Sequence, residues 1–164
     1  MNFEPELIAL AEKVVAENLA IGRKITTAES CTGGMVAAVI TEIPGASQIL
    51  EAGFITYANE AKVELLGVAP DILATLGAVS EATAWAMAAG ALKRSGADVA
   101  VAVSGIAGPG GGSEKKPVGT VVFARAFREE SGGTVVADTH HFGDLGRAEI
   151  RRQATLVALR LLLP

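Results

Sequence analysis

The sequence has a single cysteine, Cys31, among 164 residues. One cysteine excludes an intrachain disulfide and any metal site built from several cysteines. Aromatic residues are also scarce, at 4% of the chain, so alanine, valine, leucine and isoleucine must fill the core. Cores of small side chains are typical of closely packed helices and strands in layered α/β folds.

Long basic runs are missing as well. The 14 Lys and Arg residues are outnumbered by 18 Asp and Glu residues, which gives a formal net charge of −4. A chain without a basic patch has no electrostatic footprint for a nucleic acid. We therefore expect no nucleic-acid partner.

Long apolar runs are absent too. No stretch reaches the roughly 18–20 apolar residues that a membrane-spanning helix requires, and Arg160 interrupts the leucine-rich C-terminal segment. Glu4 and Glu6 lie where a secretory signal peptide would carry positive charge. These features predict a cytoplasmic protein without a membrane partner.

The chain nevertheless has enough apolar residues for an ordered core. Half of its residues are hydrophobic and 20% are charged, which excludes a disordered chain. The length corresponds to one domain, and neither an internal repeat nor a low-complexity linker is visible. We predict a single domain over residues 1–164.

Helical and strand patterns alternate along this domain. Helices are predicted at 3–20, 35–40, 59–66, 80–95 and from 147 onward. Strands are predicted at 25–28, 53–57, 98–103, 119–127 and 134–142, with a hairpin-like turn at 132–133. The strand 98–103 is apolar on both faces, as expected for a central strand covered on both sides. This order predicts an α/β fold, a three-layer α/β/α sandwich with a mixed sheet.

The segment after the first predicted strand, Ala-Glu-Ser-Cys-Thr-Gly-Gly at 28–34, is the most informative. Sites in open α/β sheets form beyond the carboxyl ends of strands. Ser30 there would lie beside backbone N–H groups at a helix N-terminus, which can stabilise an oxyanion. The alternative is that Ser30 or Thr32 only caps the helix. Glu29 is compatible with a substrate ligand and with a charge partner of the helix.

Cys31 is the alternative nucleophile, because a thiolate is intrinsically more reactive, although a lone cysteine is usually a buried hydrophobe.

A serine nucleophile needs a general base to accept its proton. His140 and His141 are adjacent, and neighbours on a strand point to opposite faces, so at most one could serve. Lys62 is the other candidate, since burial lowers the pKa of a lysine and it follows Tyr57 beyond another strand. An exposed helix lysine is the simpler interpretation.

A glycine-rich loop at 105–117 also follows a strand. Glycines let the backbone approach an anion closely, and Lys115 and Lys116 could balance phosphate charge. The loop matches neither a Walker A motif nor a dinucleotide-binding fingerprint, so an ordinary surface loop is the alternative. A possible metal cluster further along matches no specific ligand spacing: Asp138, His140, His141 and Asp144.

Five stretches together resemble the CinA C-terminal domain family. They are residues 27–34, 53–62, 77–80, 105–111 and 116–121, which occur in order and span nearly the whole chain. The best-known activity of that family is deamidation of nicotinamide mononucleotide. The resemblance therefore implies an amidohydrolase that releases nicotinic acid mononucleotide and ammonia in pyridine nucleotide salvage.

The resemblance also implies roles for single residues. Ser30 would be the nucleophile, Lys62 its base, and Tyr57 would assist proton transfer or position the lysine, while the backbone N–H groups of 31–34 hold the oxyanion. Arg147 best matches a basic residue expected near the start of the last helix. The family has Asp-Arg at this point, whereas here two residues separate Asp144 from Arg147. The substrate-binding positions implied besides Arg147 are Glu29, Thr32, Gly33, Gly34, Ser104, Gly105, Gly108 and Gly110.

The partners implied are a small-molecule nucleotide and, from the apolar helix faces and small size, further copies of the chain in a homo-oligomer. The chemistry requires no metal and no organic cofactor. Some family members carry an additional N-terminal domain linked to competence, DNA damage and pyrophosphatase activity, and this chain is expected to act as a standalone deamidase. The alternative is a non-catalytic nucleotide-binding or competence/damage-inducible CinA-type module.

Overall fold

The computed structural model describes residues 2–128 and 135–164. The helices are α1 (Pro5–Ala20), α2 (Met35–Thr41), the short 3-10 helix η1 (Ala46–Gln48), α3 (Asn59–Leu66), α4 (Pro70–Leu76), α5 (Glu81–Ser95) and α6 (Arg147–Leu161). The strands are β1 (Ile25–Glu29), β2 (Leu50–Ile55), β3 (Val99–Gly105), β4 (Thr120–Phe127) and β5 (Val136–His141).

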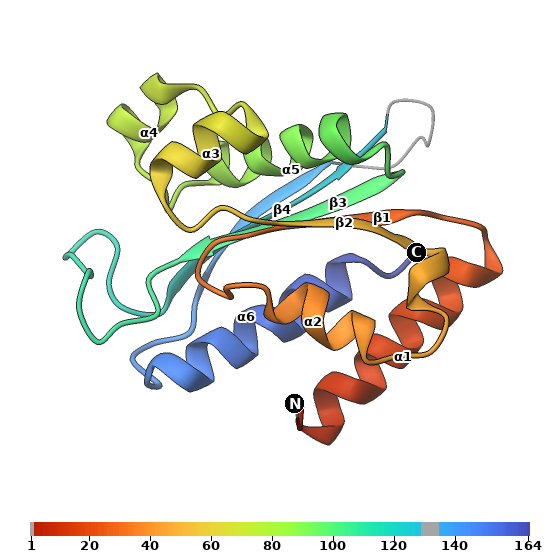
Figure 1. The fold of residues 1–164 in the computed structure, drawn as a ribbon. Helices are drawn as coiled ribbons and strands as arrows, with labels where there is room; N and C mark the ends of the chain where they lie inside the picture. Colours follow the sequence, from red (N-terminus) through yellow and green to blue (C-terminus); the bar gives the residue numbers. More distant parts are fainter. Residues whose placement is uncertain (1, 129–134) are drawn as a thin grey trace.

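The strands form one sheet in the order β2-β1-β3-β4-β5 (Figure 1). β1 pairs in parallel with β2 and β3, whereas β4 pairs antiparallel with both β3 and β5. Helices α1, α2 and α6 cover one face, and α3, α4 and α5 cover the other (Figure 1). The predicted three-layer α/β/α sandwich with a mixed sheet is confirmed.

The central strand β3 is buried on both faces, as its sequence predicted. Val99, Val101 and Val103 belong to the core beneath α1, α2 and α6, and Ala100 and Ala102 to the core beneath α5. Successive side chains of a strand point to opposite faces, so the valines fill the thicker layer. The alanines let α5 approach the sheet closely.

Several predicted boundaries differ from the structure, most of all those of β2, which begins at Leu50 and not at residue 53. β2 ends at Ile55, two residues before the predicted end, because its pairing with β1 stops at the Glu29–Ile55 register. Thr56 and Tyr57 therefore lie in a loop. Helix α4 was not predicted, although Pro70 in its first turn and a C-cap glycine are recognised helix signals. The hairpin-like turn predicted at 132–133 lies outside the described residues.

The carboxyl ends of β1, β2 and β3 meet at one edge of the sheet. The N–H of Ser30 donates to the carbonyl oxygen of Val103 at 2.9 Å, and the N–H of Thr56 donates to that of Glu29 at 2.9 Å. Residues immediately beyond three parallel strands are thereby held side by side. Within 2–128 and 135–164, no helix has both the length and the apolar character needed to cross a membrane.

Candidate active site

The side chains of Ser30 and Lys62 meet beyond the carboxyl edge of the sheet. Lys62 Nζ lies 3.0 Å from Ser30 Oγ. Ser30 follows β1 directly, and Lys62 lies in α3, so the pair joins the end of β1 to a helix of the layer on one face of the sheet. The structure therefore brings together the two side chains that the family resemblance implied as nucleophile and base.

The hydrogen-bond partners of Lys62 are neutral oxygen atoms and not carboxylates. Its side chain is 0% exposed, and Nζ also lies 2.7 Å from the carbonyl oxygen of Thr56 and 3.2 Å from that of Tyr57. Burial lowers the pKa of the Lys62 ammonium below its ordinary value of 10.5. The alternative of an exposed helix lysine is wrong, and the amine has the environment of a general base.

The turn after Ser30 has two backbone N–H groups that lack an internal acceptor. The N–H of Gly33 donates to the carbonyl oxygen of Ser30, and the N–H of Gly34 donates to Glu29. Among the described residues, no backbone carbonyl oxygen accepts the N–H of Cys31 or of Thr32. The implied oxyanion donors at 31–34 are thus reduced to two, because the glycine N–H groups already have acceptors.

Glu29 stabilises the start of α2 and is not available to a ligand. Its carboxylate accepts from the N–H groups of Gly34 at 3.0 Å, Val36 at 3.1 Å and Ala37 at 2.9 Å. Thr32 Oγ1 donates to it at 2.6 Å. Glu29 is 1% exposed. These contacts favour the alternative, a charge partner of the helix N-terminus, over the implied role as a substrate ligand.

Two hydroxyl groups implied to bind substrate are also committed within the protein. The side chain of Thr32 is fully buried and bonded to Glu29. Ser104 is buried as well, and its Oγ donates to the carbonyl oxygen of Ala78 at 2.8 Å. Ser104 holds the turn before α5 against the end of β3. Both residues shape the site without pointing a free hydroxyl group into it.

Cys31 points away from the Ser30–Lys62 pair. It belongs to the core beneath α1, α2 and α6, whereas Lys62 lies on the opposite face of the sheet. Burial raises the pKa of the Cys31 thiol to about 12. A thiol in that state has almost no thiolate at neutral pH, so burial and packing favour the interpretation of Cys31 as a core residue.

Arg147, the first residue of α6, reaches the other side of the site. Its Nη2 donates to the hydroxyl oxygen of Tyr57 at 2.8 Å, and its Nη1 donates to the carbonyl oxygen of Gly108 at 2.8 Å. The two extra residues before Arg147 therefore do not remove it from the site. The carbonyl oxygen of Tyr57 contacts Lys62, which fits the implied positioning of the lysine, while its hydroxyl group is bonded to Arg147.

The glycine-rich loop lies against this arginine. Gly105 and Gly108 are restricted to glycine by packing, since a Cβ would approach a Val121 methyl group and a Val118 methyl group within 2.7 Å. Gly110 is exposed and has open space around its Cα. Lys116 is bonded to the carbonyl oxygen of Leu76 instead, on the side of the loop that faces α4.

One residue of the turn's surroundings was not singled out from the sequence. Arg151 of α6 donates from Nε to the carbonyl oxygen of Cys31 and from Nη2 to that of Thr32, both at 3.0 Å. The sequence offered no signal that separates Arg151 from its neighbour Arg152. Its partners are backbone carbonyl oxygens, which every residue has, so the residue types do not indicate this contact.

The histidines and the acidic residues near them lie elsewhere. His140 packs against the rings of Phe123 and Phe142, and His141 Nδ1 lies 3.4 Å from Thr120 Oγ1. Both belong to β5, which β3 and β4 separate from β1. Neither can act as the base for Ser30. In the part of the chain that the structure describes, no cluster of three or more His, Cys, Asp or Glu side chains is arranged to hold a metal ion.

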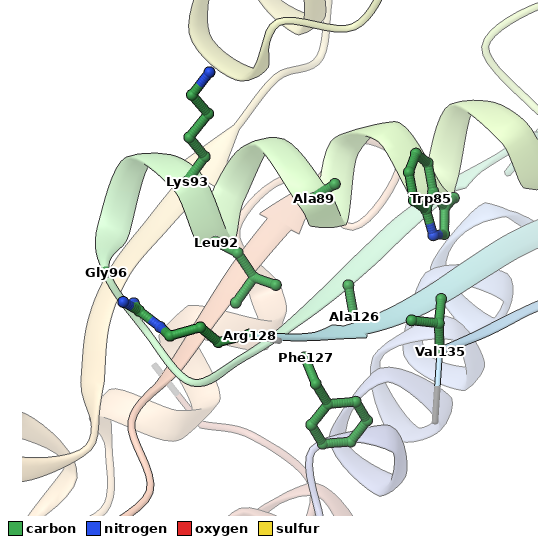
Figure 2. A pocket seen from close by; sticks show the side chains of 9 residues that line it. All are labelled: Trp85, Ala89, Leu92, Lys93, Gly96, Ala126, Phe127, Arg128 and Val135. Atoms are coloured by element: carbon green, nitrogen blue, oxygen red, sulfur yellow. The ribbon is translucent and has the colours of Figure 1, made fainter. Parts of the chain in front are cut away.

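A cavity of about 670 Å³ lies at the opposite edge of the sheet, between α5 and the end of β4 (Figure 2). Trp85, Leu92 and Arg128 are among its lining residues. None of the residues implied for catalysis or substrate binding contributes to it. The cavity and the residues gathered at the carboxyl edge are therefore separate features of the structure.

The fold and the site together define a class: an α/β protein with a buried serine–lysine pair at the carboxyl edge of a mixed sheet. The chain belongs to the CinA family, since the model of the CinA C-terminal domain matches residues 7–164. It is 52% identical to the nicotinamide-nucleotide amidohydrolase PncC of Escherichia coli K12 over 159 residues, covering 97% of this chain and 94% of that protein.

Other relatives are longer or are known as structures. A putative competence-damage inducible protein of Symbiobacterium thermophilum is 65% identical over 112 residues, which cover 68% of this chain but only 26% of that protein. A CinA-like protein of Mycobacterium avium is 53% identical, with 35% of its length covered. The crystal structure of the competence/damage inducible protein CihA from Agrobacterium tumefaciens superposes with a TM-score of 0.94 at 47% identity, covering 99% of this chain and 96% of that chain.

Proposed function

We propose that this chain hydrolyses the carboxamide of nicotinamide mononucleotide, giving nicotinic acid mononucleotide and ammonia. The observation that carries the proposal is the buried Lys62 amine 3.0 Å from the Ser30 hydroxyl. It occurs in a chain that is 52% identical, over nearly its whole length, to a nicotinamide-nucleotide amidohydrolase. An acyl-transfer reaction needs a nucleophile with a base in hydrogen-bond reach.

The neutral amine of Lys62 matches its surroundings. A neutral amine has two N–H groups and one lone pair, and the carbonyl oxygens of Thr56 and Tyr57 accept the two N–H groups. The lone pair then faces the Ser30 hydroxyl group, which donates to it. After proton transfer, the ammonium has three N–H groups, and the same three oxygens accept them. Both protonation states are therefore held without movement of the side chain.

In the first half of the reaction, Ser30 Oγ attacks the carboxamide carbon while its proton moves to Lys62 Nζ. The N–H groups of Cys31 and Thr32 donate to the oxygen that becomes negatively charged. The tetrahedral intermediate collapses, the bond from carbon to nitrogen breaks, and Lys62 returns its proton to the leaving nitrogen. Ammonia departs, and the nicotinoyl group remains as an ester on Ser30.

Water completes the cycle by the same route. Lys62 takes a proton from water, and the resulting hydroxide attacks the ester carbon. Collapse of the second tetrahedral intermediate breaks the bond to Ser30 Oγ, which recovers the proton from Lys62. The product leaves as a carboxylic acid and ionises in solution. One water is consumed and one ammonia is released, with the protein unchanged.

Arg147 supplies positive charge for the nucleotide phosphate. Hydrogen bonds to Tyr57 and to Gly108 hold its guanidinium between α3 and the glycine-rich loop. An arginine that is already oriented by neutral partners keeps its charge for an incoming phosphate. The backbone of the loop, including Gly105 and Gly110, forms the adjacent wall in this proposal.

The proposal includes four further expectations. The chain acts as one domain over residues 1–164, in the cytoplasm, without a cofactor and as a homo-oligomer. The family match over 7–164 supports the first, and the Ser–Lys chemistry needs no metal or organic group. Exposed apolar side chains such as Leu65 and Trp85 support self-association.

Ammonia release from nicotinamide mononucleotide tests the proposal. We expect turnover by the unaltered chain and by the control variant Cys31→Ala, and no turnover by Ser30→Ala. Nucleotide binding measured by calorimetry should survive in Ser30→Ala. Binding without ammonia release from the unaltered chain would contradict the proposal in favour of a non-catalytic nucleotide-binding module. No binding at all would exclude this substrate.

A further inference from the structure

Arg151 makes an unusual contact with the turn that follows Ser30. Its Nε and Nη2 donate to two consecutive carbonyl oxygens, those of Cys31 and Thr32, each at 3.0 Å. The helix that carries it lies on the opposite face of the sheet from Lys62 (Figure 1). A guanidinium is thereby placed behind the nucleophile turn, about 120 residues away along the sequence.

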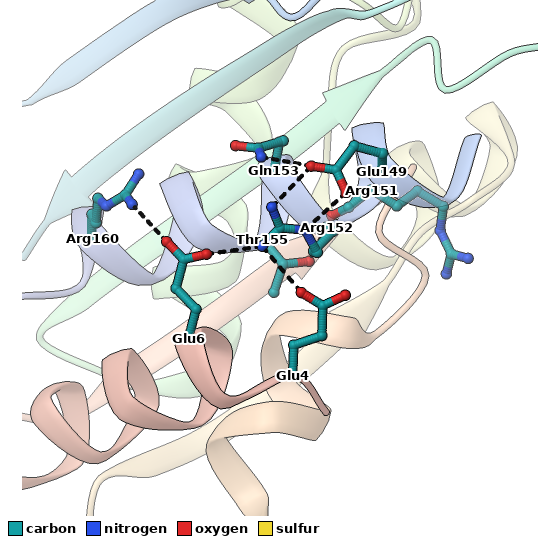
Figure 3. A network of polar contacts seen from close by, with 8 residues as sticks. All are labelled: Glu4, Glu6, Glu149, Arg151, Arg152, Gln153, Thr155 and Arg160. Carbon is teal, nitrogen blue, oxygen red and sulfur yellow. Dashed lines mark hydrogen bonds and ion pairs between the residues drawn. The ribbon is translucent and has the colours of Figure 1, made fainter. Parts of the chain in front are cut away.

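The neighbouring arginine has a different task. Arg152 pairs with Glu4, Glu6 and Glu149 and ties α1 to α6. Figure 3 shows the Arg151 guanidinium extending away from this network. Among the described residues, no carboxylate forms an ion pair with Arg151, so its charge acts on the backbone of the turn. The two adjacent arginines of α6 therefore differ in their partners: Arg152 pairs with carboxylates, and Arg151 donates to backbone carbonyl oxygens.

The direction of the Arg151 contacts determines where the turn's N–H groups point. The Cys31–Thr32 peptide is trans, so its C=O and N–H groups point in opposite directions. Because the carbonyl oxygen is held toward α6, the N–H of Thr32 points to the face that carries Ser30 Oγ and Lys62. That N–H is one of the two in the turn without an internal acceptor.

The contact also changes the strength of this donor. A cation that donates to a carbonyl oxygen withdraws electron density from the whole peptide group, which makes its N–H a stronger donor. The charge lies on the far side of the peptide from the substrate. It can therefore stabilise a developing oxyanion without competing for the phosphate.

We propose that Arg151 is a positioning residue for the reaction: it orients and polarises the Cys31–Thr32 peptide so that the Thr32 N–H binds the oxyanion. This inference rests on the proposed amidohydrolase function. A donor aimed at charge that develops only in the transition state raises kcat and leaves substrate binding nearly unchanged. A residue that merely fastened α6 to the sheet would change stability and not kcat.

The test compares Arg151→Ala and Arg151→Lys with the control Arg152→Ala. Steady-state ammonia release gives kcat and KM, and calorimetry gives the affinity for the product, nicotinic acid mononucleotide. For Arg151→Ala we expect kcat to fall at least roughly tenfold, which is less than the roughly 10²–10³-fold for loss of an oxyanion donor itself, because the Thr32 N–H remains. KM and product affinity should stay within about twofold, because the ground state does not use this donor.

Guanidinium chloride at millimolar concentration supplies a second readout. Added guanidinium should restore part of the kcat that Arg151→Ala loses. It should not change the kcat of Arg152→Ala, because that variant is expected to lose thermal stability only. If Arg151→Ala does not fold, Arg151→Lys provides the same comparison, because it keeps the charge and loses the paired contact. A folded Arg151 variant with unchanged kcat would overturn the inference alone. An unaltered chain that releases no ammonia would overturn the proposed function and the inference with it.

Discussion

The hydroxyl group of Tyr57, beyond the end of β2, accepts a hydrogen bond of 2.8 Å from Arg147 at the start of α6. Tyr57 is 58% exposed, so the bond lies at the protein surface. Its carbonyl oxygen meanwhile contacts Lys62. One residue thus links the side chain assigned to phosphate with the side chain assigned to proton transfer.

Substitution of Arg147 tests whether this side chain binds the nucleotide phosphate. We expect Arg147→Met to raise KM for nicotinamide mononucleotide roughly 10- to 100-fold, because a charge-assisted hydrogen bond is worth about 1.5–3 kcal/mol. The reason is the lost contact with phosphate, so kcat/KM for nicotinamide riboside, which has no phosphate, should change little. Steady-state ammonia release with both substrates measures the difference.

Arg160→Met, in the last turn of the same helix, is the matched control and should leave both KM values unchanged. An equal loss toward the two substrates would assign Arg147 to the reacting amide instead of the phosphate.

The protonation state of Lys62 sets the pH dependence. Burial lowers its pKa from 10.5, so kcat/KM should rise with pH through the lowered value and then become constant, as the neutral base forms. Lys62→Met should lower kcat by roughly 10²–10⁴-fold, the usual contribution of general acid–base catalysis. A profile of ammonia release from pH 5.5 to pH 10 tests both, and a flat wild-type profile would contradict the assignment.

The same shift affects stability with a defined sign. The unfolded chain binds a proton at Lys62 up to pH 10.5, whereas the folded chain releases it at lower pH. Between these two values the unfolded state holds more protons, so the free energy of unfolding rises with pH. Urea unfolding should show this rise for the wild type and a smaller one for Lys62→Met. Identical slopes would indicate that the Lys62 pKa is not lowered by folding.

Cys31 should be chemically inert in the folded protein. Its thiol is buried with a pKa of about 12, so iodoacetamide at pH 7.5 should leave it unmodified unless urea is added. Cys31→Ala should keep kcat within about twofold and lose about 1 kcal/mol of stability, the typical cost of a substitution. Mass spectrometry after labelling, with ammonia release in parallel, provides the measurement. Rapid labelling that abolishes turnover would indicate that Cys31 takes part in the reaction.

Glu29 should affect stability much more than substrate binding. Glu29→Gln removes the charge that three N–H groups and the hydroxyl groups of Thr27 and Thr32 share at the start of α2. We expect the free energy of unfolding to fall by about 1.5–3 kcal/mol. KM should change less than twofold, since the carboxylate is buried. Glu12→Gln on the exposed face of α1 is the control for urea unfolding. A large rise in KM without a loss of stability would contradict the role of Glu29 in capping α2.

The sequence by itself determined the layers and the positions of the motifs. The sequence predicted α3 at its observed bounds, capping and helical spacing predicted α5 within a residue, and the doubly apolar pattern of β3 predicted the central strand. These features are local, because periodicity and caps depend on residues within a few positions of one another. The family resemblance paired Ser30 with Lys62 before any geometry was known.

Only the tertiary structure decided what each polar group contacts. The resemblance implied that Glu29, Thr32 and Ser104 bind substrate, yet their partners proved to be groups of the protein. Nothing in the residue order indicated that Arg151 would meet two carbonyl oxygens from the other end of the chain. Such contacts arise between backbone atoms that every residue has, so their partners follow from packing and not from residue type. The burial that lowers the pKa of Lys62 likewise exists only when α3 lies against the sheet.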